Sequence, residues 1–198
     1  TAFGSDTTAS GVYSTAFGEG TLADGPNSTA WGAYTQALSH QSTAFGHKTT
    51  AGHDYATAWG YETTAGDRTT TAFGDNTAAL MEGATAWGHN TKAGKWTIKD
   101  DTGIVHDLII ETYTDDNDAE GPRKMWGVKY AENKGTDDVF IGGQTSYTSA
   151  YTELERSAST DPNVTMQGNY ATAWGNGTEA EGDYSTAFGN YTKTAAVT

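Results

Sequence analysis

The sequence predicts an all-β fold, a solenoid (a β-roll) of short parallel strands wound in 14-residue coils and interrupted by a small β-rich insert. Two observations predict this class. The motif Thr-Ala-(Phe/Trp)-Gly recurs with strict spacing, and the residues between its copies alternate with a period of two. Strict spacing is typical of solenoids, in which each unit buries itself against its neighbours. Fourteen residues are too few for a helical repeat, because helical repeats need about 33 residues or more.

The repeat divides the chain into three segments. Seven copies follow one another 14 residues apart, and two further copies follow after a gap, so that the repeats start at Thr1, Thr15, Thr29, Thr43, Thr57, Thr71, Thr85, Thr172 and Thr186. The seventh coil breaks off after Gly94, and its last quarter reappears as "GNYA" at 168–171, which matches "GDYS" at 182–185. We therefore expect coils 1–7 in residues 1–94, an inserted β-rich subdomain in 95–167, and the end of coil seven with coils 8 and 9 in 168–198.

Each coil is expected to hold two short strands and two turns. Alanine occupies position 2 of the repeat, threonine position 7, and alanine almost always position 9. Because neighbouring residues of a strand face opposite sides, these small residues are expected to line a narrow interior, with the threonine of position 1 and the aromatic residue of position 3 facing outward. The glycine of position 4 suits the bend between the two strands.

The outward aromatic residues form a ladder along the roll. Coils stack about 4.8 Å apart, so the rings of position 3 lie in one file. Such a patch is larger than monomers tolerate, and its burial would supply on the order of 15–25 kcal/mol as an upper bound. Self-association would cover it, through either a parallel three-fold or an antiparallel two-fold arrangement. The ladder comprises Phe3, Phe17, Trp31, Phe45, Trp59, Phe73, Trp87, Trp174 and Phe188.

The repeat resembles that of a known family. The segment "TAFGEGTLADG" at 15–25 is similar to the head repeat of trimeric autotransporter adhesins, the YadA-like heads, whose motif reads approximately S-V-A-I-G-x-x-S-x-A-x-G. The resemblance implies a left-handed parallel β-roll and a homotrimer, with positions 1 and 3 facing the trimer axis, so that the nine ladder residues are the trimer interface. Here rings replace the family's isoleucine, which implies either a wider trimer core or rings that stack around the axis. The family's glycine at position 11 is replaced by Ser39, His53, Asp67 and Met81.

The resemblance also implies a function. It indicates a surface-exposed adhesin head, in the outer membrane of a Gram-negative bacterium, that attaches to a host extracellular matrix protein or a cell-surface glycan. Since loops on rigid scaffolds often carry function, we expect the insert to contact the ligand through Trp96, Tyr113, Arg123 and Trp126, because exposed rings and arginine recur as binding hot spots. These rings could instead pack the insert's own core. The alternatives for the whole chain are a glycan-binding solenoid and an ice-binding β-solenoid that use the repeated aromatic and threonine face.

Charge and composition exclude other classes. The chain of 198 residues has 25 acidic and 11 basic residues, a formal net charge of −14, and no cysteine. This sign disfavours nucleic acid and anionic membranes as partners. No stretch of about 18 apolar residues and no signal segment occurs, so we expect a fragment of a longer exported protein whose signal and anchor lie elsewhere.

No cofactor, metal or catalytic group is expected. The acidic stretch 115–122, "DDNDAEGP", resembles half of a calcium loop, but Gly127 stands where the bidentate glutamate is needed. His47 and His89 share repeat position 5, yet three coils separate them by about 14 Å, too far to share an ion. No Ser-His-Asp pattern, phosphate loop or HExxH motif occurs, and the acids form no shared ladder of the kind glycosidases need. The chain is therefore not expected to be an enzyme.

Within the insert, three segments are interpretable. Residues 95–99 and 103–114 are predicted to form a hairpin across an Asp-Asp-Thr-Gly turn. Residues 124–130 and 138–143 are predicted to form a second strand pair. The stretch 146–157 fits either a helix or a strand.

Overall fold

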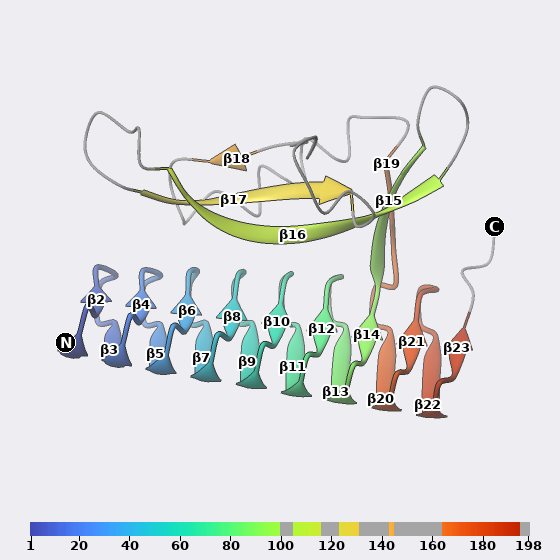
Figure 1. The fold of residues 1–198 in the computed structure, drawn as a ribbon, viewed down its shortest axis with the longest axis horizontal. Coiled ribbons are helices and arrows are strands. Elements are labelled where there is room, and N and C mark those ends of the chain that lie inside the picture. The colour runs from blue at the N-terminus through green and yellow to red at the C-terminus, as the bar shows by residue number, and fades with distance from the viewer. Residues whose placement is uncertain (100–104, 116–122, 131–142, 145–163, 195–198) are drawn as a thin grey trace. The chain divides into compact units, whose positions relative to one another are not determined.

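Two parallel sheets of nine strands each form the solenoid in the computed structural model (Figure 1). The structure describes residues 1–99, 105–115, 123–130, 143–144 and 164–194, and between 96 and 166 it describes the backbone only. Each coil contributes one longer strand to the first sheet and one two-residue strand to the second. The predicted parallel solenoid of 14-residue coils, with two strands and two turns per coil, is confirmed over about nine turns.

The longer strands begin at the Thr-Ala-aromatic-Gly motif and cover repeat positions 1 to 5. They are β1 (Ala2–Ser5), β3 (Thr15–Glu19), β5 (Thr29–Ala33), β7 (Thr43–His47), β9 (Thr57–Tyr61), β11 (Thr71–Asp75), β13 (Thr85–His89), β20 (Thr172–Asn176) and β22 (Thr186–Asn190). Threonine and aromatic residues favour this extended backbone, which explains why the motif forms the longer strand.

The short strands cover repeat positions 8 and 9. They are β2 (Thr8–Ala9), β4 (Leu22–Ala23), β6 (Gln36–Ala37), β8 (Thr50–Ala51), β10 (Thr64–Ala65), β12 (Ala78–Ala79), β14 (Lys92–Ala93), β21 (Glu179–Ala180) and β23 (Lys193–Thr194). A bend at position 6 and a turn at positions 11 to 13 connect the two kinds of strand. Both connections contain a residue in the left-handed region, for example Glu62 with φ of 51° and Tyr55 with φ of 60°.

The pairing register passes across the insert unchanged. β13 pairs with β20 so that Thr85 lies opposite Thr172 and Trp87 opposite Trp174. β14 pairs with β21 in the same way, with Ala93 opposite Ala180. The polypeptide therefore leaves the seventh coil and returns to it without shifting any later coil.

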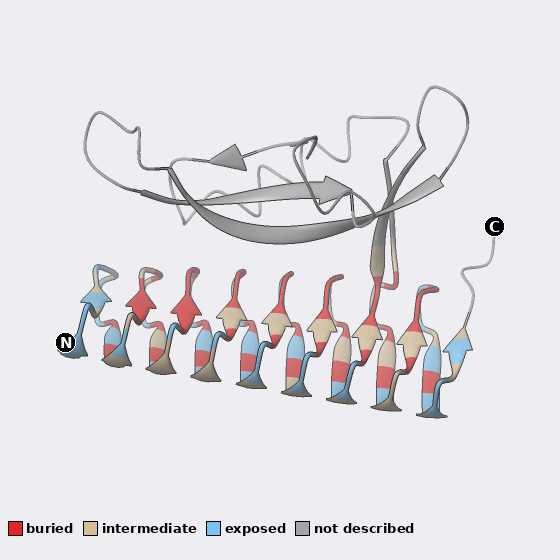
Figure 2. Ribbon diagram, in the orientation of Figure 1, coloured by how far each residue is buried: buried red, intermediate tan, exposed pale blue. Residues whose placement is uncertain are grey.

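The core of the roll is a narrow column of alanine and threonine side chains. Position 2 and position 9 alanines such as Ala58 and Ala65 are fully buried, and so are position 7 threonines such as Thr63 (Figure 2). The threonines of position 1 and the rings of position 3 are mostly exposed. The predicted division into inward and outward positions is confirmed.

The glycine of position 4 has a role that the sequence did not indicate. It lies inside the longer strand, not in the bend, so the expectation was wrong on this point. Gly60 has φ of +129°, and a Cβ atom built on it would lie 1.9 Å from the carbonyl oxygen of Gly74 in the next coil. The same close approach recurs from Gly4 to Gly175 along the stack. Position 4 therefore needs glycine for two reasons, backbone conformation and the spacing of coils.

The position 7 threonines carry hydroxyl groups that the interior does not satisfy. The Oγ1 atom of Thr63 is buried and has no hydrogen-bond partner among the described residues, and the same holds for Thr21, Thr35, Thr49, Thr77, Thr91 and Thr178. An unpartnered buried polar group costs roughly 1–3 kcal/mol. Threonine at this position therefore contributes through its shape and its methyl group.

We predict that Thr63→Val leaves the free energy of unfolding unchanged or raises it by about 1 kcal/mol, because valine keeps the shape and removes the unpartnered hydroxyl. Thr63→Ser is the matched control. It keeps the hydroxyl and loses a methyl group, so it should lower the free energy of unfolding by about 1 kcal/mol. Urea denaturation followed by circular dichroism measures both. A valine variant less stable than the serine variant would show that the hydroxyl is needed.

The insert forms a five-stranded sheet of its own, with strand order β18-β17-β16-β15-β19. Its strands are β15 (Lys95–Lys99), β16 (Val105–Asp115), β17 (Arg123–Tyr130), β18 (Gly143–Gln144) and β19 (Val164–Gln167). The predicted hairpin is confirmed, since β15 and β16 pair antiparallel with Trp96 opposite Leu108. The second predicted pair is seen in part, because β17 pairs with β18 at Gly127 and Gly143, whereas 131–142 and 146–157 lie outside the described residues. β17 also pairs with β16 along eight residues, and β19 completes the sheet, neither of which was predicted.

The contacts between Cα atoms separate the chain into two units. One comprises Thr1–Lys95 with Gln167–Thr198, and the other comprises Trp96–Met166. The strands of the two nine-stranded sheets lie in the first unit, and β16, β17 and β18 lie in the second.

Candidate functional site: an exposed aromatic ladder

The rings of position 3 form one uninterrupted stack along the first sheet. Successive ring centroids lie 5.0–5.6 Å apart from Phe3 to Phe188. Like rings lie flat on one another, with interplanar angles of 9° for Phe3–Phe17 and 6° for Trp87–Trp174. Each phenylalanine beside a tryptophan packs edge to face, at 68–88°. The stack crosses the insertion point without a gap.

The ladder remains half exposed in the single chain. Trp31 and Trp59 each keep 51% of their surface in solvent, and only Phe73 falls into the half-buried class. Stacking therefore covers about half of each ring, and a further partner would gain on the order of 1 kcal/mol per ring from the remainder. Nine rings in one file make a continuous apolar surface of the kind that marks an interaction site.

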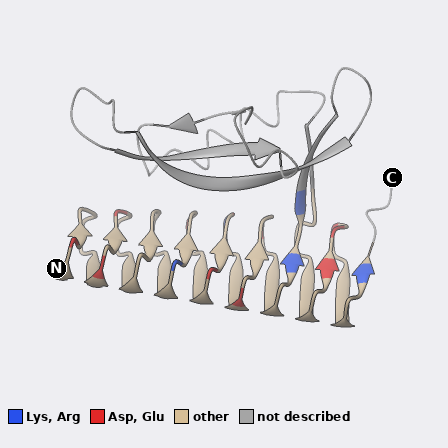
Figure 3. Cartoon of the chain, viewed as in Figure 1, with Lys and Arg blue, Asp and Glu red and all other residues tan. Residues whose placement is uncertain are grey.

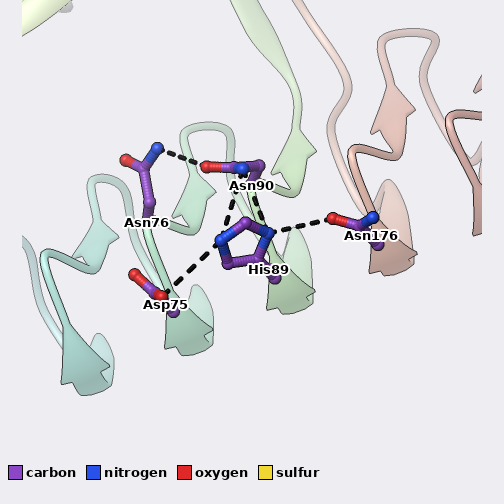
Figure 4. A network of polar contacts seen from close by, with 5 residues as sticks. All are labelled: Asp75, Asn76, His89, Asn90 and Asn176. Atoms are coloured by element: carbon purple, nitrogen blue, oxygen red, sulfur yellow. Dashed lines mark hydrogen bonds and ion pairs between the residues drawn. The ribbon is translucent and has the colours of Figure 1, made fainter.

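A column of polar side chains runs beside the ladder at positions 5 and 6 (Figure 4). Asn76 donates a hydrogen bond from Nδ2 to Oδ1 of Asn90, 2.6 Å away. His89 contacts Oδ1 of Asn176 through Nδ1 at 2.9 Å, and its Nε2 lies 3.6 Å from the Asp75 carboxylate. These contacts link three successive coils across the insertion point. The 14-residue spacing of Asn76 and Asn90 was a signal of this column that the sequence reasoning missed.

The same two positions are aromatic in earlier coils. Tyr34 packs edge-on against His47, and His47 stacks on Tyr61 at 5.1 Å with an interplanar angle of 5°. Tyr34 also donates a hydrogen bond to the Glu19 carboxylate, which raises the pKa of the phenol. The column therefore contains aromatic rings in coils three to five and polar side chains in coils six to eight.

Charges on the strands of the roll are few, and they concentrate near the insertion point (Figure 3). The Glu181 carboxylate is buried and lies 3.2 Å from the Lys95 ammonium and 2.7 Å from that of Lys193. Lys193 also pairs with Glu179 at 2.8 Å, and its hydrogen bonds to these two carboxylates raise its pKa. The Lys95–Glu181 pair joins Lys95, where β15 begins, to coil eight, and the pairs of Lys193 join coil nine to coil eight.

The turn of coil four contains a buried histidine, His53, which lies beside the turn of coil three. The backbone N–H of Asp54 donates to Nδ1 of His53 at 2.7 Å, and Asp54 accepts hydrogen bonds from the Ser39 hydroxyl and from the His40 N–H. Burial of the His53 imidazole lowers its pKa. The Asp67 and Asp54 carboxylates act in the opposite direction but do not overcome the burial. The folded chain therefore favours neutral His53.

This shift predicts a pH dependence of stability. The unfolded chain takes up a proton at the ordinary histidine pKa of about 6.5, whereas folded His53 takes it up only at lower pH, so the unfolded state binds more protons in this window. The free energy of unfolding should therefore be highest above the ordinary pKa and fall as the pH drops below it. Thermal melts between pH 7.5 and 5.5 measure the effect. His53→Gln should flatten the dependence and His40→Gln should not. The opposite order would assign the pH effect to another residue.

The proposed ligand contacts of the insert lie on its sheet. Trp96 is in β15, Tyr113 in β16, and Arg123 and Trp126 in β17. The backbone places Trp126 opposite Thr112 and Tyr113 opposite Met125. Their role in ligand contact stays a prediction. The acidic stretch after Asp115 lies outside the described residues.

Within the described part of the chain, no group of three or more histidine, aspartate or glutamate side chains is arranged to hold a metal ion. Among these same residues there is also no helix that is long and apolar enough to cross a membrane.

The fold and the ladder define a class of repeat protein, a parallel β-solenoid of 14-residue coils with an aromatic stack on one face. The family model for the YadA head domain repeat, in two copies, matches residues 1–21, 9–35, 37–63 and 167–192. The coils in these ranges are therefore YadA head domain repeats, which are typical of the heads of trimeric autotransporter adhesins, a family that is generally non-enzymatic. Adhesins of this family are outer-membrane surface proteins of Gram-negative bacteria. Comparison with curated proteins and with solved structures gave no match.

Proposed function

We propose that the chain is the head segment of a homotrimeric adhesin at the surface of a Gram-negative bacterium. In this trimer, three left-handed rolls meet along their ring ladders and display three copies of the insert. The half-exposed, uninterrupted stack of nine rings is the observation that carries the proposal. The YadA head repeats support the trimeric arrangement.

A parallel three-fold axis suits the order of the rings along the ladder. Copies related by such an axis place the same coil of each chain at the same level. Phenylalanine then meets phenylalanine and tryptophan meets tryptophan at every level. An antiparallel pair would instead place Phe17 against Trp174, so the two rings at that level would differ in size.

The insert, which we assign to residues 95–167 as a separate subdomain, is proposed as the region that contacts a host matrix protein or a cell-surface glycan. Trp96, Tyr113, Arg123 and Trp126 are the proposed contact residues. The roll then serves as a rigid support, because its hydrogen bonds run continuously from coil to coil on both sides of the insertion.

Removing the insert tests this assignment. The ends of the insert are adjacent, since a Cβ atom on Gly168 would lie 2.2 Å from Cα of Gly94. Deleting 95–167 and joining Gly94 to Gly168 therefore restores a regular turn. We expect a folded trimer that has lost at least ten-fold in attachment to matrix-coated surfaces or cells. Replacing the insert by an unrelated domain of similar length is the control for steric effects. Full attachment by the deleted chain would place the binding surface on the rolls.

A further inference from the structure

Three described segments carry the pattern Asn-x-Thr, in which the asparagine amide is the acceptor for N-linked sugar. They are Asn27–Ser28–Thr29, Asn176–Gly177–Thr178 and Asn190–Tyr191–Thr192. A fourth, Asn163–Val164–Thr165, begins outside the described residues. Because the pattern requires a hydroxyl two residues after the asparagine, a transferase has to reach that hydroxyl together with the amide.

In the two C-terminal copies of the pattern, the asparagine side chains are joined to the polar column. Nδ2 of Asn176 donates to Oδ1 of Asn190 at 2.9 Å, and Oδ1 of Asn176 contacts His89. Their threonines occupy position 7, where Thr178 is fully buried and the Oγ1 atom of Thr192 has no exposed surface. Both amides take part in the polar column, Asn190 through Oδ1 alone, and neither threonine hydroxyl is exposed.

Asn27 lies outside the polar column. It lies in the exposed turn after Pro26 with φ of 57°, and its backbone N–H is fixed to the Val12 carbonyl at 2.8 Å. Its side chain makes no hydrogen bond with the described residues. Thr29, two residues on, is only half-buried and starts β5.

The surroundings of Asn27 leave space for a bulky group. The same turn position is exposed in coils one and four, where Tyr13 keeps 86% and Tyr55 51% of its surface in solvent. A substituent on Asn27 would therefore extend away from the core of the roll without displacing core side chains.

We propose that Asn27 is an N-glycosylation site that accepts a sugar activated as a phosphate ester. In the transfer, Nδ2 of Asn27 forms a bond to the anomeric carbon while the bond from that carbon to the phosphate oxygen breaks. The phosphate leaves with the electron pair, and the amide proton passes to a base of the transferase. Asn176 and Asn190 stay unmodified on the folded chain.

The test uses an asparagine N-glycosyltransferase and a nucleotide-activated hexose on the purified, folded chain, with occupancy measured by peptide mass mapping. In the proposed trimer Thr29 lies beside the axis, where neighbouring chains restrict the access of the transferase. The Trp59→Asp/Trp87→Asp variant, which is expected to be a folded monomer, is therefore assayed in parallel. We expect Asn27 to be modified in at least one of the two samples, at least ten-fold above Asn176 and Asn190. Proteolytic peptides of the chain, in which all three sites are open, should lose this selectivity.

Three variants define the site. Asn27→Gln and Thr29→Ala should abolish the modification, whereas Thr29→Ser should retain it. Failure of Asn27 to react in both folded samples would overturn the proposal, and so would equal modification of Asn176 or Asn190. Because the monomeric variant is included, these outcomes are independent of whether the trimer forms.

Discussion

Gly60→Ala is expected to lower the free energy of unfolding by about 3 kcal/mol or more. The φ angle of Gly60, +129°, is one that L side chains rarely adopt, and such strain costs roughly 1–3 kcal/mol. The new Cβ atom would also lie 1.9 Å from the Gly74 carbonyl oxygen, so the coils would have to separate and weaken their pairing. Overpacking of this kind typically costs a further 1–3 kcal/mol. Urea denaturation followed by circular dichroism measures the change.

Gly20→Ala is the matched control, because it changes the same residue type in the same kind of coil. Gly20 occupies position 6 with φ of +59°, where other coils hold Asp6, Lys48 or Glu62. Its new Cβ would meet only the ring of Tyr34, an exposed side chain that can move. We expect a loss of about 1 kcal/mol. If the two variants were equally stable, backbone contact between coils would not explain the glycine at position 4.

Replacing two ladder tryptophans, Trp59→Asp/Trp87→Asp, is expected to convert the proposed trimer into a folded monomer. Around a three-fold axis each substitution gathers three carboxylates at one level, in place of three apolar rings. Like charges brought together in an interface cost several kcal/mol, and the ring contacts at both levels are lost as well. Light scattering should show a mass of 20.9 kDa, where the unmodified chain gives three times this value. Circular dichroism should show unchanged strand content.

Tyr55→Asp/Tyr170→Asp is the control for this pair. The two tyrosines are exposed to 51% and 50%, much as Trp59 and Trp87 are to 51% and 49%, but they lie at turn position 13 away from the ladder. The control variant should remain trimeric. A monomeric unmodified chain, or equal dissociation of both variants, would show that the ladder is not the surface through which the chains assemble.

Much of the roll could be predicted from the sequence because one repeat determines its neighbours. The 14-residue spacing fixes which residues pair between coils, and small residues at positions 2, 7 and 9 leave only one way for the side chains to face. The in-register return of the chain at Thr172 follows from the same repeat. These features depend on local pattern, which a single sequence contains.

Other features depend on geometry that the letters do not contain. The glycine of position 4 looked like a bend residue, since glycine is common in bends, and only the distance from Gly60 to Gly74 shows its role as a spacer. The pairing of β17 with β16 joins residues that no repeat relates. The polar column around His89 combines positions 5 and 6 of three coils, although each of its residues alone resembles an ordinary surface residue.

The adjacency of Gly94 and Gly168 has an evolutionary consequence. A coil that closes its own backbone pairing across these two glycines allows the sequence between them to diverge with little effect on the folding of the roll. The roll can therefore stay nearly constant while the exchanged segment adapts, and chimeras that carry foreign domains at this junction should fold as readily as the parent chain.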